Sequence, residues 1–183
     1  MDIETRFALL QNTYAASIAE TVNTYDKLKV LDTIVERRKE RQAHTAPFLN
    51  RQLGIETVQD VFERLSEVYG CANWSVEKSD NGYVATAVSC RLCALSKKMG
   101  GANPCNGWCL DPMSAMITAA ARIDAGGIIV ESTLVTGDCC RVLVNVSAEE
   151  NSTVVTSPTY GDDGPNPSLP LRQITSGCSI LLC

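Results

Sequence analysis

Residues 74–90 read WSVEKSDNGYVATAVSC, and this stretch decides the class of the fold. Apolar and polar residues alternate on both sides of Asp80-Asn81-Gly82, as they do in strands that bury one face. The residues Asp-Asn-Gly favour a type I′ turn because they tolerate the positive φ angles that this turn requires. The stretch therefore predicts an antiparallel hairpin.

A second hairpin is expected further along the chain. Its strands are predicted at residues 128–135 and 139–146, with the turn at Thr136-Gly137-Asp138. Between the two hairpins, Asp111-Pro112 predicts the start of a helix with Asp111 as the N-cap, and Gly126-Gly127 is expected to end it. The order ββαββ predicts a four-stranded antiparallel sheet with a helix packed on it.

Helices are expected before the first hairpin. Apolar residues recur at three- and four-residue steps over residues 3–42, which predicts a long helix with a break near Asn23-Thr24 and an end before Pro47. Residues 55–69 predict another helix, with Thr57 and Asp60 forming a capping box and Gly70 just past the end.

These elements predict a single α+β domain over residues 1–147, in which residues 1–50 are the N-terminal helical part. Residues 148–183 differ in composition, because Pro, Gly and Ser replace the periodic apolar pattern. They are expected to form an extended C-terminal tail.

Composition and charge narrow the function. The chain has 183 residues, of which 45% are hydrophobic and 20% charged, as in globular proteins. Its 21 acidic residues exceed 16 Lys and Arg, and a net charge of -5 argues against a nucleic-acid partner. The N-terminus lacks a signal-peptide pattern, and no apolar run reaches the roughly 20 residues of a membrane span. The expected location is therefore cytoplasmic, with no membrane partner.

Cysteine is the unusual residue, with nine copies against a single histidine, His44. An odd count in a reducing compartment argues against a disulfide framework. Cys90, Cys93, Cys105 and Cys109 have spacings that could hold a structural zinc ion or an iron–sulfur cluster, the alternative to a site without cofactors. Disulfide exchange at the Cys90-x-x-Cys93 motif is a second alternative, although the motif is expected to end a strand rather than open a helix.

A catalytic thiol is the third interpretation and the favoured one. Cys109 comes just before a predicted helix start, where the partial positive charge of the helix stabilises a thiolate. A thiolate attacks an electrophilic carbon such as an amidine or acyl carbon. Asp111 could activate a water molecule there, and His44 is the one histidine that could act as a base. Cys71, Cys178 and Cys183 are expected to be incidental.

Four short motifs occur in an order that resembles the L-2-amino-thiazoline-4-carboxylic acid hydrolase family. They are Cys90, Cys109-x-Asp111, Glu131-Ser132-Thr133-Leu134 and Gly137-Asp138-Cys139-Cys140. The resemblance covers residues 50–147 and extends to the related 4-vinyl-reductase type of small-molecule-binding domain. It implies hydrolytic opening of a cyclic amidine-like thiazoline to an N-carbamoyl cysteine, acting on a C–N or C–S bond.

The resemblance also implies a site. It would place Cys90, Cys109, Asp111, Glu131 and Cys140 around one pocket that binds a small-molecule substrate. Three further cysteines and the tail depart from the family pattern, which favours a diverged member, for example in natural-product tailoring or sulfur amino-acid metabolism. The three are Cys93, Cys105 and Cys139.

Two other classes of function remain open. The same fold could bind a small ligand or zinc without chemistry. The long N-terminal apolar stripe also exceeds what one short helix needs for packing, which predicts a homodimer through this helix.

Overall fold

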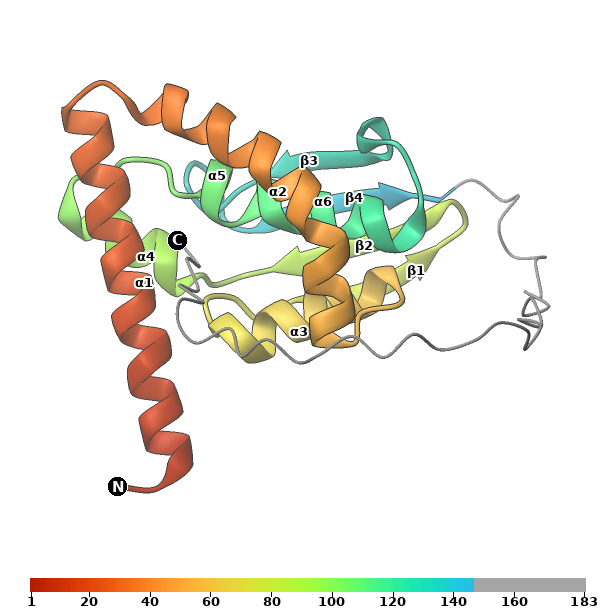
Figure 1. The fold of residues 1–183 in the computed structure, drawn as a ribbon, viewed down its shortest axis with the longest axis horizontal. Coiled ribbons are helices and arrows are strands. Elements are labelled where there is room, and N and C mark those ends of the chain that lie inside the picture. The colour runs from red at the N-terminus through yellow and green to blue at the C-terminus, as the bar shows by residue number, and fades with distance from the viewer. Residues whose placement is uncertain (147–183) are drawn as a thin grey trace, which may run out of the picture. The chain divides into compact units, whose positions relative to one another are not determined.

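The chain combines helices with one antiparallel sheet, as the sequence predicts. The structure, a computed structural model, describes residues 1–146. The helices are α1 (Ile3–Lys27), α2 (Leu31–Leu53), α3 (Val58–Tyr69), α4 (Arg91–Met99), α5 (Cys105–Trp108) and α6 (Leu110–Ala121). The strands are β1 (Ser75–Ser79), β2 (Gly82–Ala87), β3 (Ile128–Ser132) and β4 (Cys140–Asn145). Figure 1 shows their arrangement. The predicted tail, residues 148–183, lies outside the described residues.

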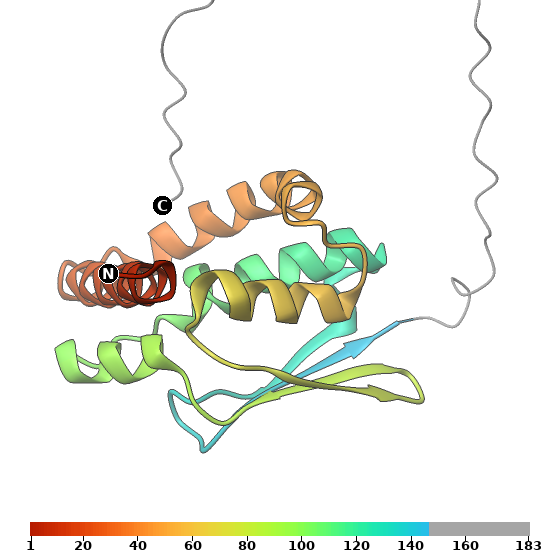
Figure 2. The same ribbon diagram turned by 90° about the horizontal axis from the view of Figure 1, so that it is seen from below.

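The two hairpins join into a four-stranded sheet in the order β1-β2-β4-β3, with every neighbouring pair antiparallel. Along β2 and β4 alternate residues are buried, and Ala85 lies opposite Val142 in the register. The helices gather on the face of the sheet to which these buried residues point (Figure 2). This alternation is the period of two that the first hairpin shows in the sequence.

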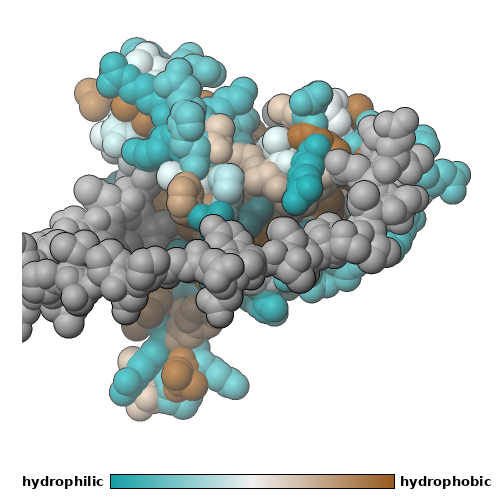
Figure 3. Space-filling model, turned by 45° about the vertical axis from the view of Figure 1, so that its right-hand side comes forward, coloured by the Kyte–Doolittle hydropathy of each residue, from teal (hydrophilic) through white to brown (hydrophobic). Residues whose placement is uncertain are grey.

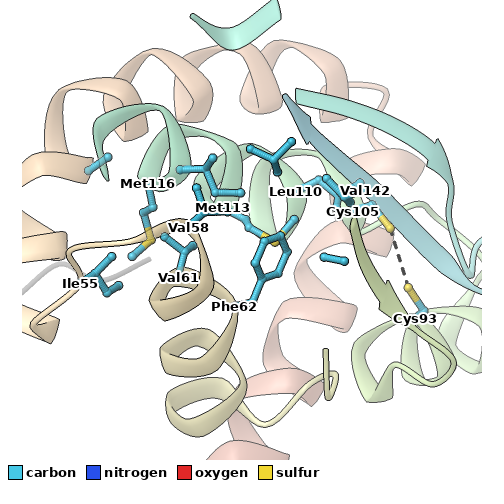
Figure 4. Close-up of a cluster of buried hydrophobic side chains, with 14 residues drawn as sticks. Ile55, Val58, Val61, Phe62, Cys93, Cys105, Leu110, Met113, Met116 and Val142 are labelled. Carbon is cyan, nitrogen blue, oxygen red and sulfur yellow. Dashed lines mark hydrogen bonds between the residues drawn. The ribbon is translucent and has the colours of Figure 1, made fainter. Parts of the chain in front are cut away.

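The main core lies between this sheet face and helices α3 and α6. Phe62 from α3 and Met113 and Ile117 from α6 are fully buried with Val142 of β4 (Figure 4). The ring of Phe62 lies 5.3 Å from that of Trp74. Burial of each such side chain contributes about 1.5–3 kcal/mol to stability, so this layer holds the sheet and the two helices together.

The N-terminal helices differ from the prediction in their ends. Helix α1 continues past Asn23 to Lys27, and α2 runs through Pro47 to Leu53, so the predicted end before Pro47 is wrong. Proline removes one helical hydrogen bond at this position. Beyond Pro47, the last turn of α2 is held against α6, because buried Asn50 donates from Nδ2 to the carbonyl of Met116 at 2.9 Å.

Local signals near the first hairpin are confirmed in part. Thr57 and Asp60 form the predicted capping box, and Gly70 ends α3 in the left-handed conformation. The type I′ turn is wrong, since Gly82, at φ 143°, is the one turn residue with positive φ. Helix α6 ends at Ala121, before the predicted Gly126-Gly127, which lies in a 3₁₀ turn.

The segment between the hairpins contains two helices, α4 and α5, that were not predicted from the sequence. Helix α4 packs against α1, where Leu92 joins Ile18, Ala19 and Val22 in a second buried cluster. The order of elements is therefore ββαααββ and not ββαββ. Within residues 1–146, none of the helices has the length and apolar content needed to cross a bilayer.

A buried amide network fixes α4 and the loop after it. Asn23 of α1 donates from Nδ2 to Ser96 Oγ at 3.0 Å, and its Oδ1 accepts from the Ala102 amide at 3.0 Å. Ser96 Oγ in turn donates to the Ala102 carbonyl at 2.6 Å. The asparagine therefore holds both ends of the segment that leads from α4 toward Cys105.

Replacing Asn23 with alanine is expected to lower the free energy of unfolding by about 1–3 kcal/mol, because buried partners lose their hydrogen bonds. Denaturant titration followed by circular dichroism measures the change. Gln59→Ala, which removes an exposed hydrogen bond to Glu63, is the control and is expected to change stability by less than about 0.5 kcal/mol. An equal, small effect of both substitutions would contradict the assigned role of Asn23.

Candidate functional site

A pocket of about 520 Å³ opens where the end of α3, the start of α4 and the loop between β3 and β4 meet. Its size is within the usual range for small-molecule sites. Three cysteines and two basic residues line it, and its lining includes no Asp or Glu. The lining residues that matter for chemistry are Cys71, Cys90, Arg91, Cys93, Lys97 and Leu134.

Cys90 is the N-cap of α4, and its sulfur accepts the backbone N–H of Cys93 at 3.5 Å. The Cys90-x-x-Cys93 motif therefore opens a helix, and the expectation that it ends a strand is wrong. The short stripe of Leu92, Leu95 and Met99, followed by Gly100, is the sequence signal for this helix. At a helix start, unpaired N–H groups favour negative charge on a nearby atom.

Cys71 lies beside Cys90, contrary to the expectation that Cys71 is incidental. The carbonyl of Cys71 accepts the backbone N–H of Arg91 at 2.7 Å, which ties the end of α3 to the start of α4. The Cys71 thiol lies 3.7 Å from the carbonyl of Tyr69. No local pattern predicts this pairing, because the two segments are separated by the whole first hairpin.

Arg91 and Lys97 make the rim of the pocket basic, and neither was among the predicted site residues. Both are exposed, and Lys97 Nζ donates to the carbonyl of Leu134 at 2.7 Å. Arg91 and Lys97 are six positions apart on α4, which corresponds to about 1.7 helical turns, so the two cations lie at different places on the rim. An anionic group entering the pocket meets two cations and no carboxylate.

Cys109 and Asp111 differ from their predicted roles. Cys109, not Asp111, is the N-cap of α6, and Asp111 Oδ2 accepts the Gly107 amide at 2.7 Å. Neither residue is among those that line the pocket. Burial, followed by the neighbouring thiols of Cys90 and Cys71, raises the pKa of Cys109 well above its usual range. The expected lowering of its pKa by the helix start is therefore wrong.

Cys140 and Glu131 separate onto different faces of the sheet. Cys140 is buried at the start of β4, packs in one cluster with Cys90 and Leu134, and accepts the Leu134 amide at 3.3 Å. Glu131 is exposed and accepts from Arg141 Nε at 2.6 Å. The fold thus brings Cys140 close behind the pocket, while Glu131 is engaged in a surface ion pair.

The pKa values of the three cysteines that line the pocket, Cys71, Cys90 and Cys93, lie above the usual range, so these thiols are protonated near neutral pH. A hydrogen bond to Cys93, followed by burial, raises the pKa of Cys90. A hydrogen bond to Cys105 raises the pKa of Cys93 to about 12, and burial raises that of Cys71 to about 11. Burial disfavours the charged thiolate, and at Cys71 the charge of Arg91 offsets this effect only in part. Any nucleophilic role must therefore include loss of the thiol proton.

The described residues do not form the zinc site that was the alternative interpretation. Within residues 1–146, no group of three or more Cys, His, Asp or Glu side chains is arranged to hold a metal ion. Of the four candidates Cys90, Cys93, Cys105 and Cys109, the sulfurs of Cys93 and Cys105 lie 3.8 Å apart, at thiol hydrogen-bond distance. His44 is exposed on α2 and does not line the pocket.

Comparisons with protein-family models, with curated proteins and with solved structures found no match to this chain.

Proposed function

We propose that the protein hydrolyses a small cyclic amidine that carries a carboxylate, of the 2-aminothiazoline-4-carboxylate class, with Cys90 as the nucleophile. The observation that carries the proposal is the position of Cys90, which lines a pocket of about 520 Å³ at the start of α4 with Arg91 and Lys97 on the rim. The order of motifs that resembles the thiazoline hydrolase family supports the same substrate class. The proposed nucleophile is therefore Cys90 and not Cys109, the residue favoured from the sequence.

Different parts of the pocket would bind the two ends of the substrate. Arg91 and Lys97 would bind the carboxylate, since charge-assisted hydrogen bonds to such anions are the strong ones. The amidine carbon would then lie within the pocket that the Cys90 side chain lines. The absence of carboxylates from the pocket lining avoids repulsion of an anionic substrate.

The reaction proceeds through a covalent intermediate. The Cys90 thiol loses its proton to solvent, and the thiolate adds to the amidine carbon. The ring C–S bond then breaks, and the ring sulfur leaves as a thiol after taking a proton. Water attacks the resulting isothiourea carbon, the bond to Cys90 breaks, and the product is an N-carbamoyl cysteine with the enzyme thiol restored.

The start of α4 assists charge development. The backbone N–H of Cys93 already points to the Cys90 sulfur at 3.5 Å, and the Leu92 backbone N–H lowers the pKa of this thiol. The same groups stabilise negative charge on the sulfur as the proton leaves. They act against two effects that keep the thiol protonated, the hydrogen bond that Cys90 donates to the Cys93 sulfur and the burial of Cys90.

The direct test incubates the full chain with 2-aminothiazoline-4-carboxylate and follows release of a new thiol colorimetrically and the product by mass spectrometry. Arg91→Ala and Lys97→Ala are each expected to raise KM about tenfold, because each removes a charge-assisted contact. Lys98→Ala, an exposed neighbour outside the pocket, is the matched control. Binding without turnover would replace the hydrolase with a non-catalytic small-molecule-binding domain, the alternative function.

The cellular setting proposed for this reaction is cytoplasmic sulfur amino-acid or natural-product metabolism. The seven cysteines between Cys71 and Cys140 are free thiols in the structure, which fits a reducing compartment.

We propose further that two copies of the chain associate through the first half of α1. This segment exposes apolar side chains at helical spacing, including Ile3, Phe7 and Leu10, which are 81%, 48% and 66% exposed. Figure 3 shows apolar side chains on the part of the molecule that projects below its body, where α1 begins in Figure 1. A two-fold axis lets the same stripe cover itself on a second copy.

The double variant Phe7→Glu, Leu10→Glu is expected to have the mass of one chain in light scattering, where the unaltered chain has the mass of two. Charged residues in this stripe would face each other across the two-fold axis and lose apolar burial. Glu20→Lys, at an exposed position further along α1, is the control for a change of charge alone. A single-chain mass for the unaltered protein at micromolar concentration would refute the dimer.

A further inference from the structure

Three thiols form a line from the pocket into the core. Cys90 is half-buried and lines the pocket, Cys93 lines it while being only 5% exposed, and Cys105 behind them is 2% exposed. The Cys90 sulfur lies 3.5 Å from the Cys93 amide nitrogen. The sulfurs of Cys93 and Cys105 are 3.8 Å apart, and Figure 4 shows this contact as a dashed line. Cys93 is thus the neighbour of both other thiols.

The local structure explains the line. N-cap and N3 residues of a helix face each other, as Thr57 and Asp60 do in the capping box of α3, and Cys90 and Cys93 occupy these positions in α4. Cys105 is brought opposite by the loop that Asn23 holds through the amide of Ala102. The short path between Cys93 and Cys105 therefore depends on tertiary contacts that span the chain.

The sulfurs of Cys93 and Cys105 need to approach by only about 1.8 Å to reach the 2.05 Å of a disulfide bond. Side-chain rotation at one cysteine moves a sulfur by this much. Neither sulfur is reached readily by a reagent in solution, because both residues are buried. Cys90 is the least buried of the three, so it is the thiol expected to react first with a disulfide in the pocket.

We propose that the protein carries a thiol–disulfide relay, in which Cys90 accepts a small-molecule disulfide from the pocket and Cys93 passes the oxidation to a buried Cys93–Cys105 disulfide. This activity goes beyond the proposed hydrolysis and does not require it. The oxidant is a low-molecular-weight disulfide that carries carboxylates, such as oxidised glutathione. The basic residues Arg91 and Lys97 at the rim suit such an anion.

Each step of the relay exchanges one thiolate for another. The Cys90 thiolate attacks the disulfide RSSR, forms a mixed disulfide and releases RS⁻, which takes a proton. The Cys93 thiolate attacks the Cys90 sulfur, forms the Cys90–Cys93 disulfide and releases the second RSH. The Cys105 thiolate then attacks the Cys93 sulfur and frees Cys90. In sum, two protein thiols lose two electrons and two protons, and RSSR becomes two RSH.

The relay also changes the thiol that remains in the pocket. In the reduced protein, a hydrogen bond to the Cys93 thiol raises the pKa of Cys90. Once Cys93 is in the disulfide, this thiol partner is gone, whereas the Cys93 amide still points to the Cys90 sulfur. Cys90 is therefore expected to react faster with iodoacetamide at pH 7.5 in the oxidised protein than in the reduced protein, by about tenfold for one pKa unit.

The experiment treats the reduced full chain with oxidised glutathione, quenches it with acid at timed intervals, alkylates free thiols and maps the disulfides by mass spectrometry. The Cys93–Cys105 disulfide is the expected product. Cys90→Ser is expected to slow its formation at least tenfold, and Cys105→Ser to stop the reaction at the Cys90–Cys93 disulfide. Cys139→Ser is the matched control, because Cys139 is a half-buried thiol in hydrogen-bond contact with the Ser132 hydroxyl. This variant is expected to behave as the unaltered chain.

Two results would overturn the relay. One is absence of the Cys93–Cys105 disulfide from the folded, unaltered chain after long exposure to oxidised glutathione. The other is formation of this disulfide at the same rate in Cys90→Ser. Circular dichroism of each variant separates a folding defect from a chemical one. The alkylation rate of Cys90 in the reduced and the oxidised unaltered chain tests the relay without any substitution. A chain that forms the disulfide but does not open aminothiazolines refutes the hydrolase and leaves the relay intact.

Discussion

Replacing Cys90 with alanine is expected to reduce kcat/KM for aminothiazoline opening by at least about 1000-fold, because the covalent path loses its nucleophile. The fold should persist, since Cys90 caps α4 only through a long sulfur contact of 3.5 Å to the Cys93 amide. Steady-state kinetics with the unaltered chain and the variant measure the change. Mass spectrometry of rapidly quenched protein should find the isothiourea adduct on Cys90 alone.

Two further alanine variants give this prediction its contrast. Cys139→Ala removes a thiol that does not line the pocket and should keep full activity. Cys109→Ala removes the thiol at the start of α6 and should keep most of the turnover. If Cys109→Ala were inactive and Cys90→Ala active, with both folded, the nucleophile would be Cys109 and the assignment to Cys90 would be wrong.

The second large effect is a rise of about tenfold in kcat/KM per pH unit between pH 7 and 9. Burial and the hydrogen bond to Cys93 raise the pKa of Cys90, so the reactive thiolate is a minor species over this range. Its fraction grows tenfold per pH unit as long as the pH stays below the pKa. A profile that stays flat from pH 7 to 9, at substrate concentrations well below KM, would contradict thiolate attack by Cys90.

Cys93→Ala tests the cause of that profile. Removing the Cys93 thiol takes away the hydrogen bond that raises the pKa of Cys90, so the pH profile is expected to shift to lower pH. The rate at pH 7 should then exceed that of the unaltered chain. Val76→Ala, in β1, is a control for loss of packing, and it should lower stability without moving the profile.

The relation between the α1 stripe and the pocket follows from the fold. The first half of α1 projects, while its second half packs against α4, whose start carries Cys90. Asn23 lies in that second half and bonds to Ser96 of α4. One helix therefore serves both the expected dimer contact and the support of the pocket, and the Asn23→Ala variant should loosen the pocket as well as the fold.

The sequence predicted those features that depend on near neighbours. Alternation around Asp80-Asn81-Gly82 identified the first hairpin, because a half-buried strand repeats every two residues. The capping box of Thr57 and Asp60 was legible because its two partners are three residues apart. Even so, the pattern placed the N-cap of α6 at Asp111, where the chain instead uses Asp111 to hold the Gly107 amide.

Other features arise only from contacts between distant segments. Helix α4 was not predicted, because its nine residues carry only a short apolar stripe and the helix that this stripe packs against, α1, lies about 70 positions earlier. Glu131 and Cys140 were expected in one pocket, but their side chains lie on opposite sides of the sheet. Glu131 pairs with Arg141 on the exposed side, and Cys140 is buried on the other side. A bulge between Val130 and Ser132 shifts the register at that point, and no sequence pattern specified it.

Composition by itself made cysteine the candidate for any chemistry, since the chain has nine cysteines and one histidine. What tertiary structure decided is which thiols meet. Cys71 reaches the pocket because its carbonyl accepts the Arg91 amide across the first hairpin. Cys105 meets Cys93 because a loop held by Asn23 returns it to α4. Both contacts close long loops of chain, and the hydrogen bonds and burial that stabilise them exist only when the whole domain is folded.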